Sequence, residues 1–239
     1  MELAEVVGQL VALRRFPVVG FSGETPNEVA VRSDGAVGDR AFEIVEEASG
    51  RTLTSRDTPE LLAFSARFLE DLVVEDLESW TRVKTPDGRE FPLSDAEWLA
   101  ELSRRLGRPV RWRRVAEGTP ERGVLHLMSR PTLRFVERVY GATLEPRFLR
   151  ANFLIDLSEG KAFEEDEWVG RQIRIGDTLC ELLAPSADCL AVTDRLDKPA
   201  GDLSMVAGLL KVRGGSLGLR ARATKGQRIR VADPVSLVD

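Results

Sequence analysis

The chain is poor in soft ligands, because its 239 residues include only two cysteines and one histidine. That count argues against zinc sites with four cysteine or histidine ligands and against iron–sulfur clusters held by cysteine. It also provides no disulfide framework, which fits a reducing compartment. No run approaches the roughly 20 apolar residues of a membrane helix, and the acidic stretch 1–5 lacks a signal-peptide layout. We therefore expect a cytoplasmic protein without a membrane segment.

The charge balance is mildly acidic, with a formal net charge of −5. A protein that binds nucleic acid generally is basic, so we expect no nucleic-acid partner. One basic run, 111–114, is better interpreted as a solvated edge strand. Hydrophobic residues at 43% and charged residues at 31% are typical of a globular protein with a substantial core. The length allows one large all-β domain or two small domains.

Short strand patterns dominate the chain. They are expected at 6–13, 42–46, 62–69, 72–75, 124–128, 152–156, 172–175 and 178–183. Residues 83–91 predict a hairpin, since Asp87-Gly88 supplies the turn. A last pair of strands, 217–223 and 228–231, is expected to meet at 225–227.

Three helices are predicted among these strands. The first begins at a capping box, Ser94 to Glu97, and ends at Gly107. The second runs over 131–140 and stops at Gly141. A short helix is expected over 204–211. Short strands with a few helices predict a mainly β fold centred on a β-barrel.

Six segments follow one another in an order that belongs to a known family. They are 13–20 with its Phe-Pro-Val, Gly38-Asp39-Arg40-Ala41-Phe42, the Gly-x-x-Leu-Thr-x-Arg-x-x-Pro-x-Leu of 50–61, Arg150-Ala151-Asn152-Phe153, the stretch 163–168 followed by 173–176, and the Cys189 loop. Together they resemble the MOSC family, named for the C-terminal domain of molybdenum cofactor sulfurase. The resemblance implies a MOSC-type β-barrel core over 91–239 with a smaller packed N-terminal β domain over 1–90.

The resemblance also implies a ligand, the molybdenum cofactor, in which a molybdopterin dithiolene holds the metal and carries a phosphate. Arginine suits a phosphate because its planar fork bonds two oxygens at once. The residues that match the family's cofactor contacts are Arg40, Arg56, Ser129, Thr132, Arg150 and Asn152. Some of these side chains could serve the fold instead: Arg56 could form a surface ion pair, Asn152 could bond backbone, and Ser129 and Thr132 could cap a helix.

Cys189 matches the family's molybdenum ligand, and a soft thiolate suits a metal already bound by sulfur. Cys180, by contrast, lies in an alternating strand and is expected in the core. The single histidine, His126, is either a satisfied strand residue or a proton donor near the metal.

Several positions depart from the family's reductases. Val19-Gly20 stands where those proteins have lysine and serine, and Asp188 stands where they have arginine, beside the anionic ligand. The segment 193–197 lacks the usual Asp-x-x-Thr-Gly ending. The cofactor is therefore expected in an altered pose, with Ser186 or backbone N–H groups replacing lost contacts, or the ligand has changed.

The resemblance implies an oxidoreductase that reduces an N-oxygenated or related small molecule by oxygen-atom transfer. Since two cysteines cannot ligate an iron–sulfur cluster, electrons are expected from a separate protein of ferredoxin or flavin reductase type. Two alternatives stay open: a non-catalytic carrier of the cofactor or of sulfur, and an enzyme on the same fold that uses Cys189 as a nucleophile without molybdenum. The oligomeric state is left open.

Overall fold

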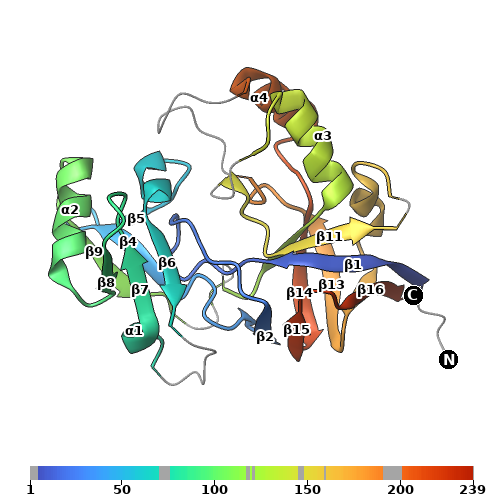
Figure 1. Cartoon of the computed structure of the whole chain (residues 1–239), viewed down its shortest axis with the longest axis horizontal. Helices are drawn as coiled ribbons and strands as arrows, with labels where there is room; N and C mark the ends of the chain where they lie inside the picture. The colour runs from blue at the N-terminus through green and yellow to red at the C-terminus, as the bar shows by residue number, and fades with distance from the viewer. Residues whose placement is uncertain are drawn as a thin grey trace.

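A computed structural model describes residues 5–69, 76–116, 119, 122–144, 148–158, 160–190 and 201–238. The protein is mainly β, as predicted, and its larger half is a closed barrel (Figure 1). The strand order around the barrel is β1-β11-β10-β14-β13-β12-β16. Among the described residues, no helix is both long and apolar enough to cross a membrane.

The barrel joins the beginning of the chain to its second half. Its strands are β1 (Glu5–Leu13), β10 (Leu125–Ser129), β11 (Phe153–Leu157), β12 (Gln172–Ile175), β13 (Thr178–Pro185), β14 (Leu219–Lys225) and β16 (Pro234–Val238). β10 and β11 pair in parallel and the other neighbours antiparallel. Inward side chains such as Leu10, Ile155 and Ile173 form the barrel core, and Cys180 lies among them as predicted.

A smaller half packs around a second core, which lies between Val18 and Trp112 in the sequence. It contains two three-stranded sheets, β5-β4-β9 and β6-β7-β8. Its elements are β4 (Phe42–Glu46), β5 (Thr52–Leu53), a 3-10 turn η1 (Pro59–Ala63), β6 (Ser65–Phe68), α1 (Leu77–Trp80), β7 (Thr81–Lys84), β8 (Glu90–Pro92), α2 (Ala96–Leu106) and β9 (Val110–Arg114). The basic run 111–114 lies in β9, which is an edge strand of its sheet with mostly exposed side chains, as predicted. The domain boundary predicted at residue 90 stays a prediction. α2 and β9 follow that residue in the sequence and pack with the smaller core.

Three sequence-based details are corrected. Asp95, not Ser94, caps α2, because its carboxylate accepts the Glu97 N–H at 2.7 Å. The strand expected over 62–69 is shorter, since Pro59 opens the turn η1 and β6 begins only at Ser65. The strand expected over 72–75 lies outside the described residues.

The third correction concerns the last pair of strands. β15 (Arg228–Arg230) does not pair with β14; it pairs with β2 (Glu28–Arg32), which also pairs with β3 (Gly35–Ala36). The physical reason is that both edges of β14 are already paired, with β10 on one side and β13 on the other.

Two helices cover one end of the barrel (Figure 1). α3 (Arg130–Tyr140) connects the parallel strands β10 and β11, and it contacts α4 (Leu203–Val212). Val136 and Tyr140 of α3 pack with Val206 of α4 in a third apolar cluster, which also contains Cys189. A 3-10 turn, η3 (Glu164–Trp168), packs against β10.

Candidate functional site

Asn152 connects three segments at the point where the two halves meet. Its N–H donates to the His126 carbonyl at 2.7 Å, and its Oδ1 accepts the His126 N–H at 3.0 Å. Its Nδ2 donates to the Arg14 carbonyl at 3.2 Å, and the Arg14 N–H donates back to the Asn152 carbonyl at 2.8 Å. The side chain has no exposed surface, so these bonds fix its orientation.

Arg40 reaches the same asparagine from the smaller half. One guanidinium nitrogen bonds the Asp39 carboxylate and lies 3.5 Å from Asn152 Oδ1. Asp39 is itself held by the Phe16 N–H at 2.7 Å. The backbone of Arg40 has φ 49°, a left-handed conformation that costs a non-glycine residue energy and is common where a side chain must be aimed.

Arg150 contacts the same Phe16 ring as Arg40. Its guanidinium carbon is 4.0 Å from the ring centroid and that of Arg40 is 5.4 Å from it, so two cations share one aromatic ring. The Arg150 side chain also donates to the Phe21 carbonyl. Both contacts hold the guanidinium in place without neutralising its charge.

The electrostatics of this group favour an anion. Burial, aided by the charges of Arg40 and Arg14, lowers the pKa of Arg150 to about 9, while Asp39 and Asp188 oppose the shift. Burial also lowers the pKa of Arg14. The Arg150 charge is thus poorly solvated and is close enough to Arg40 to be destabilised by it, and an anionic ligand would relieve that cost.

The single histidine is bonded to Ser186. His126 Nδ1 lies 2.7 Å from Ser186 Oγ, which also accepts the Asp188 N–H at 3.1 Å. Burial, followed by the charges of Arg40, Arg220 and Arg150, lowers the pKa of His126 to about 2. The imidazole is therefore neutral at ordinary pH, and its Nδ1 contact orients the Ser186 hydroxyl.

Cys189 is in the loop after β13, as predicted, but its side chain is fully buried. Its Sγ lies 3.6 Å from the Leu127 carbonyl, and its own carbonyl accepts the Arg150 N–H at 2.7 Å. Burial raises the pKa of the thiol to about 12; the charges of Asp188 and Glu165 add to the shift, and a hydrogen bond with Ser186 opposes it. The free thiol is therefore protonated at neutral pH.

Asp188 is paired across the boundary between the halves. Its Oδ1 accepts from Arg56 at 3.1 Å, and the same Arg56 nitrogen lies 3.4 Å from the Ala187 carbonyl. The two side chains are 71% and 59% exposed, so the pair contributes little to stability. It nevertheless places a cation beside the carboxylate that departs from the family pattern.

Ser129 and Thr132 contact a different partner. The Ser129 hydroxyl and the Thr132 hydroxyl donate to Glu165 Oε2 at 2.8 Å and 2.9 Å, and the Ser129 N–H donates to Oε1 at 3.1 Å. Ser129 also caps α3. A buried carboxylate of the chain itself therefore occupies the positive end of this helix.

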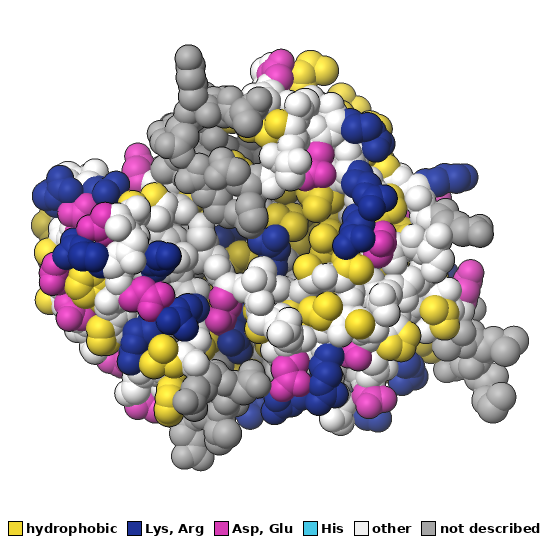
Figure 2. Space-filling view, in the orientation of Figure 1, with side chains coloured by type: hydrophobic (Ala, Val, Ile, Leu, Met, Phe, Trp, Pro, Cys, Tyr) yellow, Lys and Arg dark blue, Asp and Glu magenta, His cyan; other side chains and the backbone are white. Residues whose placement is uncertain are grey.

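Hydrogen bonds, ion pairs and ring contacts join most of the predicted residues in one group. Its members are Arg40, Arg56, His126, Arg150, Asn152, Ser186, Asp188 and Cys189. Sequence reasoning missed Arg14, although it lies in the first family segment, and Glu165, which lies in the fifth. Figure 2 shows basic and apolar side chains together in the hollow between the halves. The described residues contain no cluster of three or more histidine, cysteine or acidic side chains suited to a metal.

The chain belongs to the MOSC family. The model of the MOSC domain matches residues 113–236, more than half of the chain, and the model of the MOSC N-terminal beta barrel domain matches residues 7–94. These matches confirm the family inferred from the six segments. Comparison with curated proteins gives no match.

One solved structure supports the fold. The crystal structure of the YUAD protein from Bacillus subtilis superposes with a TM-score of 0.53 at 9% identity, over 100% of this chain and 99% of that one. At this identity the likeness shows the fold alone. The crystal structure of a hypothetical protein matches 48% of this chain and 50% of its own, at 16% identity and a TM-score of 0.32, which is too low to support an argument.

Proposed function

We propose that the protein binds the molybdenum cofactor and reduces an N-oxygenated or related small molecule. The observation that carries this proposal is the group around Asn152: Arg40 contacts the Asn152 side chain, and the neighbouring Arg150, whose pKa the Arg40 charge lowers, donates its N–H to the Cys189 carbonyl. Membership in the MOSC family supplies the identity of the anion. The substrate takes up two electrons and two protons, its N–O bond breaks, and the amine and water leave.

The types of side chain in this group suit the molybdenum cofactor. Arg40 and Arg150 would hold the anionic tail, because a guanidinium bonds phosphate oxygens in pairs. Hydrogen bonds already hold Oδ1 and Nδ2 of Asn152 in place. Through its contact with Arg40, Asn152 would help to orient the edge of the pterin. Cys189 would supply the thiolate, and the metal charge would hold it deprotonated although burial alone favours the thiol.

When bound, the cofactor supplies a two-electron redox centre for oxygen-atom transfer. The protein's own residues prepare the site. Ser186, oriented by His126, lies beside Cys189 and can relay the proton that the thiol must lose to His126 Nδ1. An anion on Arg40 and Arg150 offsets two of the charges that lower the pKa of His126, so the imidazole becomes a better proton carrier once the ligand is present.

Electrons are proposed to come from a separate protein of ferredoxin or flavin reductase type. The chain cannot bind a cysteine-ligated cluster itself, since its two cysteines are 180 and 189. The exposed pair of Arg56 and Asp188 borders the site on the outside and offers both signs of charge to a partner.

Metal analysis tests the binding step. The full chain, produced in a host that makes the cofactor, should carry molybdenum, and Cys189→Ala should lose most of it. Cys180→Ala is the matched control, because it removes an equally buried thiol in the barrel core and should keep the metal. A wild-type protein without molybdenum, or a Cys189→Ala variant that keeps it, contradicts the proposal.

Turnover with a reduced dye and a hydroxylamine-type acceptor then distinguishes an enzyme from a carrier. The metal-loaded protein should produce amine, whereas a carrier would contain molybdenum without turnover. The third alternative, Cys189 acting as a metal-free nucleophile, receives no support from the site. A thiol whose pKa is about 12 and whose side chain is buried is a poor nucleophile at neutral pH.

A further inference from the structure

Three arginines form a row along α3. Arg130, Arg134 and Arg138 are spaced four residues apart, and side chains at this spacing are neighbours on a helix. Arg134 and Arg138 are exposed, and the side chain of Arg130 is 34% exposed. In Figure 2 basic side chains follow one another along the helix that Figure 1 labels α3, beside the hollow between the two halves.

The opposite face of α3 packs toward Cys189. Thr132, Val136 and Tyr140 are buried, and each follows an arginine of the row by two residues, which is roughly 200° around the helix. Val136 and Tyr140 belong to the apolar cluster that contains Cys189. One helix, about 10–12 Å across with its side chains, therefore lies between the arginine row and the cluster that holds Cys189.

The fold leaves two of the three arginines without an ion pair. Arg130 donates to Asp156 at 2.8 Å. Arg138 lies 5.5 Å from the centroid of the Phe135 ring, which carries no charge. Within the described part of the chain, no carboxylate lies at ion-pair distance from Arg134 or Arg138.

Acidic residues near the row do not change this arrangement. Glu137, on the same helix, uses its carboxylate to accept the Leu144 N–H at 3.1 Å. The undescribed segments that follow α3 and precede α4, residues 145–147 and 191–200, each contain as many basic as acidic residues, and residue 159 adds one glutamate. These segments contain no run of acidic residues.

The surface beside the row is partly apolar. α4 contacts α3 and includes Met205 and Val212, which are 55% and 88% exposed. Arginine and methionine are both enriched in protein–protein interfaces, where apolar and polar contacts lie side by side. The combination favours a protein as the partner of this surface.

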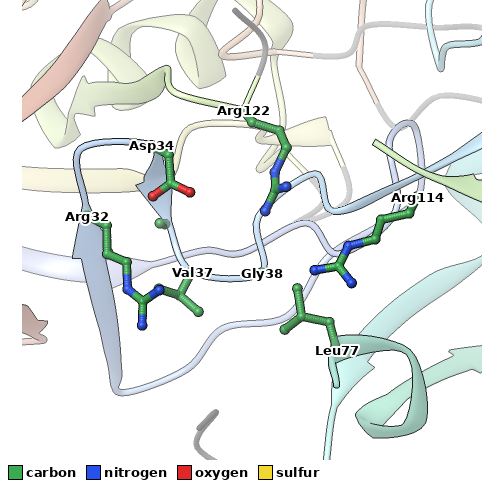
Figure 3. Close-up of a pocket in the computed structure, with 8 residues that line it drawn as sticks. Arg32, Asp34, Val37, Gly38, Leu77, Arg114 and Arg122 are labelled. Atoms are coloured by element: carbon green, nitrogen blue, oxygen red, sulfur yellow. The ribbon is translucent and has the colours of Figure 1, made fainter. Parts of the chain in front are cut away.

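Other arginines do not offer such a surface. Arg32, Arg114 and Arg122 line a cavity of about 30 Å³ where the two halves meet (Figure 3), and a cavity of this size admits only a few water-sized groups. Arg40 and Arg150 are largely buried in the proposed cofactor site.

A small acidic protein suits the row better than a nucleic acid or a membrane. The whole chain has a formal net charge of −5, so most of its surface would repel a long polyanion or an anionic lipid layer. A small protein needs only the local row, and complementary charge also orients the protein as it approaches.

We propose that the arginine row of α3 is the docking surface for an acidic electron-carrier protein. This inference rests on the proposed function, because the row lies one helix away from the cluster that holds Cys189. Two carriers, each oxidised by one electron, supply the two electrons of one turnover.

Binding of an acidic plant-type ferredoxin to the full chain without molybdenum, measured by calorimetry at low salt, tests this surface. Wild type should bind with a Kd on the order of 10 μM, as transient electron-transfer partners do. Arg134→Glu combined with Arg138→Glu should weaken binding by roughly tenfold or more. Salt at about 0.5 M should weaken wild-type binding as well, because it screens exposed charges.

The matched control makes the same change in net charge elsewhere. Arg51→Glu combined with Arg111→Glu changes two exposed arginines of the smaller half and should leave the Kd within about twofold of wild type. Arg134→Ala combined with Arg138→Ala, which keeps good helix formers in α3, serves as a second test if the glutamate variant does not fold.

Turnover separates this inference from the proposed function. With the metal-loaded protein, the glutamate variant should lose roughly tenfold in kcat/KM for reduced ferredoxin and keep the wild-type rate with a reduced dye, which needs no docking surface. If wild type is active with neither donor, the proposed function is contradicted. Activity with the dye but not with ferredoxin contradicts the docking surface alone.

Three binding results would overturn the docking surface: no binding of ferredoxin by wild type, equal weakening in the control variant, or unchanged binding when Arg134 and Arg138 are both replaced. Duplex DNA or anionic vesicles that bound through the same two arginines more tightly than ferredoxin would also overturn it.

Discussion

Asn152 and His126 bond each other twice: the amide oxygen of Asn152 accepts the His126 N–H, and the His126 carbonyl accepts the Asn152 N–H. His126 lies in β10 and Asn152 immediately precedes β11, so this reciprocal pair continues the parallel pairing of the two strands by one step. It also sets the position of the only histidine and, through Ser186, of the loop that carries Cys189.

Removing the Asn152 side chain should destabilise the fold. In Asn152→Ala the buried His126 N–H loses its acceptor, and an unsatisfied buried donor costs about 1–3 kcal/mol. We expect the free energy of unfolding, measured by urea denaturation, to fall by that amount. The other asparagine, Asn27, is exposed, so Asn27→Ala should change it by less than about 0.5 kcal/mol. Equal effects from the two variants would contradict the role assigned to Asn152.

The stability of the protein should depend on His126 below neutral pH. Its pKa is about 2 in the fold, against about 6.5 in the unfolded chain, so between these values only the unfolded chain takes up the proton. Stability therefore falls as the pH falls through this window, by up to about 1.4 kcal/mol per pH unit from this group.

His126→Gln removes that contribution while other acidic transitions stay. The difference in unfolding free energy between wild type and His126→Gln should thus change steadily between about pH 6.5 and pH 4.5. A difference that is constant over this range would show that His126 is not held neutral.

The carboxylate of Glu165 should be structural. It accepts hydrogen bonds from Ser129 and Thr132 with no exposed surface, so Glu165→Gln replaces one acceptor by a donor and should cost about 1–3 kcal/mol of unfolding free energy. Glu167→Gln, two residues away and exposed, is the control and should be close to neutral. A Glu165→Gln variant as stable as wild type would show that the hydrogen bonds of Ser129 and Thr132 do not need a carboxylate.

Asp188 should weaken the binding of an anionic ligand. Under the proposed function, Asp188→Asn removes a negative charge near Arg150 and Cys189, and molybdenum should be retained up to about tenfold more tightly during dialysis. Arg56→Gln should have the opposite effect, because it leaves Asp188 without its partner. Asp57→Asn, next to Arg56 in the sequence and exposed, should change nothing. If Asp188→Asn retained molybdenum no more tightly than wild type, the charge of this carboxylate would not affect ligand binding.

Local patterns predicted most of the elements because they depend on neighbours in the sequence. The glycines at 107 and 141 end α2 and α3 in the left-handed conformation, as expected. The cap of α2 was misplaced by one residue, since Ser94 and Asp95 are both good caps and only the fold decides between them. The pairing of β15 with β2 was missed because strand pairing depends on which edges are free.

The candidate site was predictable where a family motif contained the residue. Arg40, Arg150, Asn152 and Cys189 were named from such motifs, and the structure places them in one connected group, while the roles proposed for them stay predictions. Arg14 was missed although it lies in the first family segment, because the pattern recognised there is Phe-Pro-Val and does not include the arginine.

β1 belongs to a barrel whose other strands all come from the second half of the chain, and Glu5 is in register with Leu237. During synthesis the smaller core is complete once Trp112 has emerged, whereas β1 must wait for β16 before the barrel can close. Closure over such a sequence separation is slow. The smaller half can thus form first, so Arg40 would be in place before the Cys189 loop meets it, and the site would be the last part of the molecule to assemble.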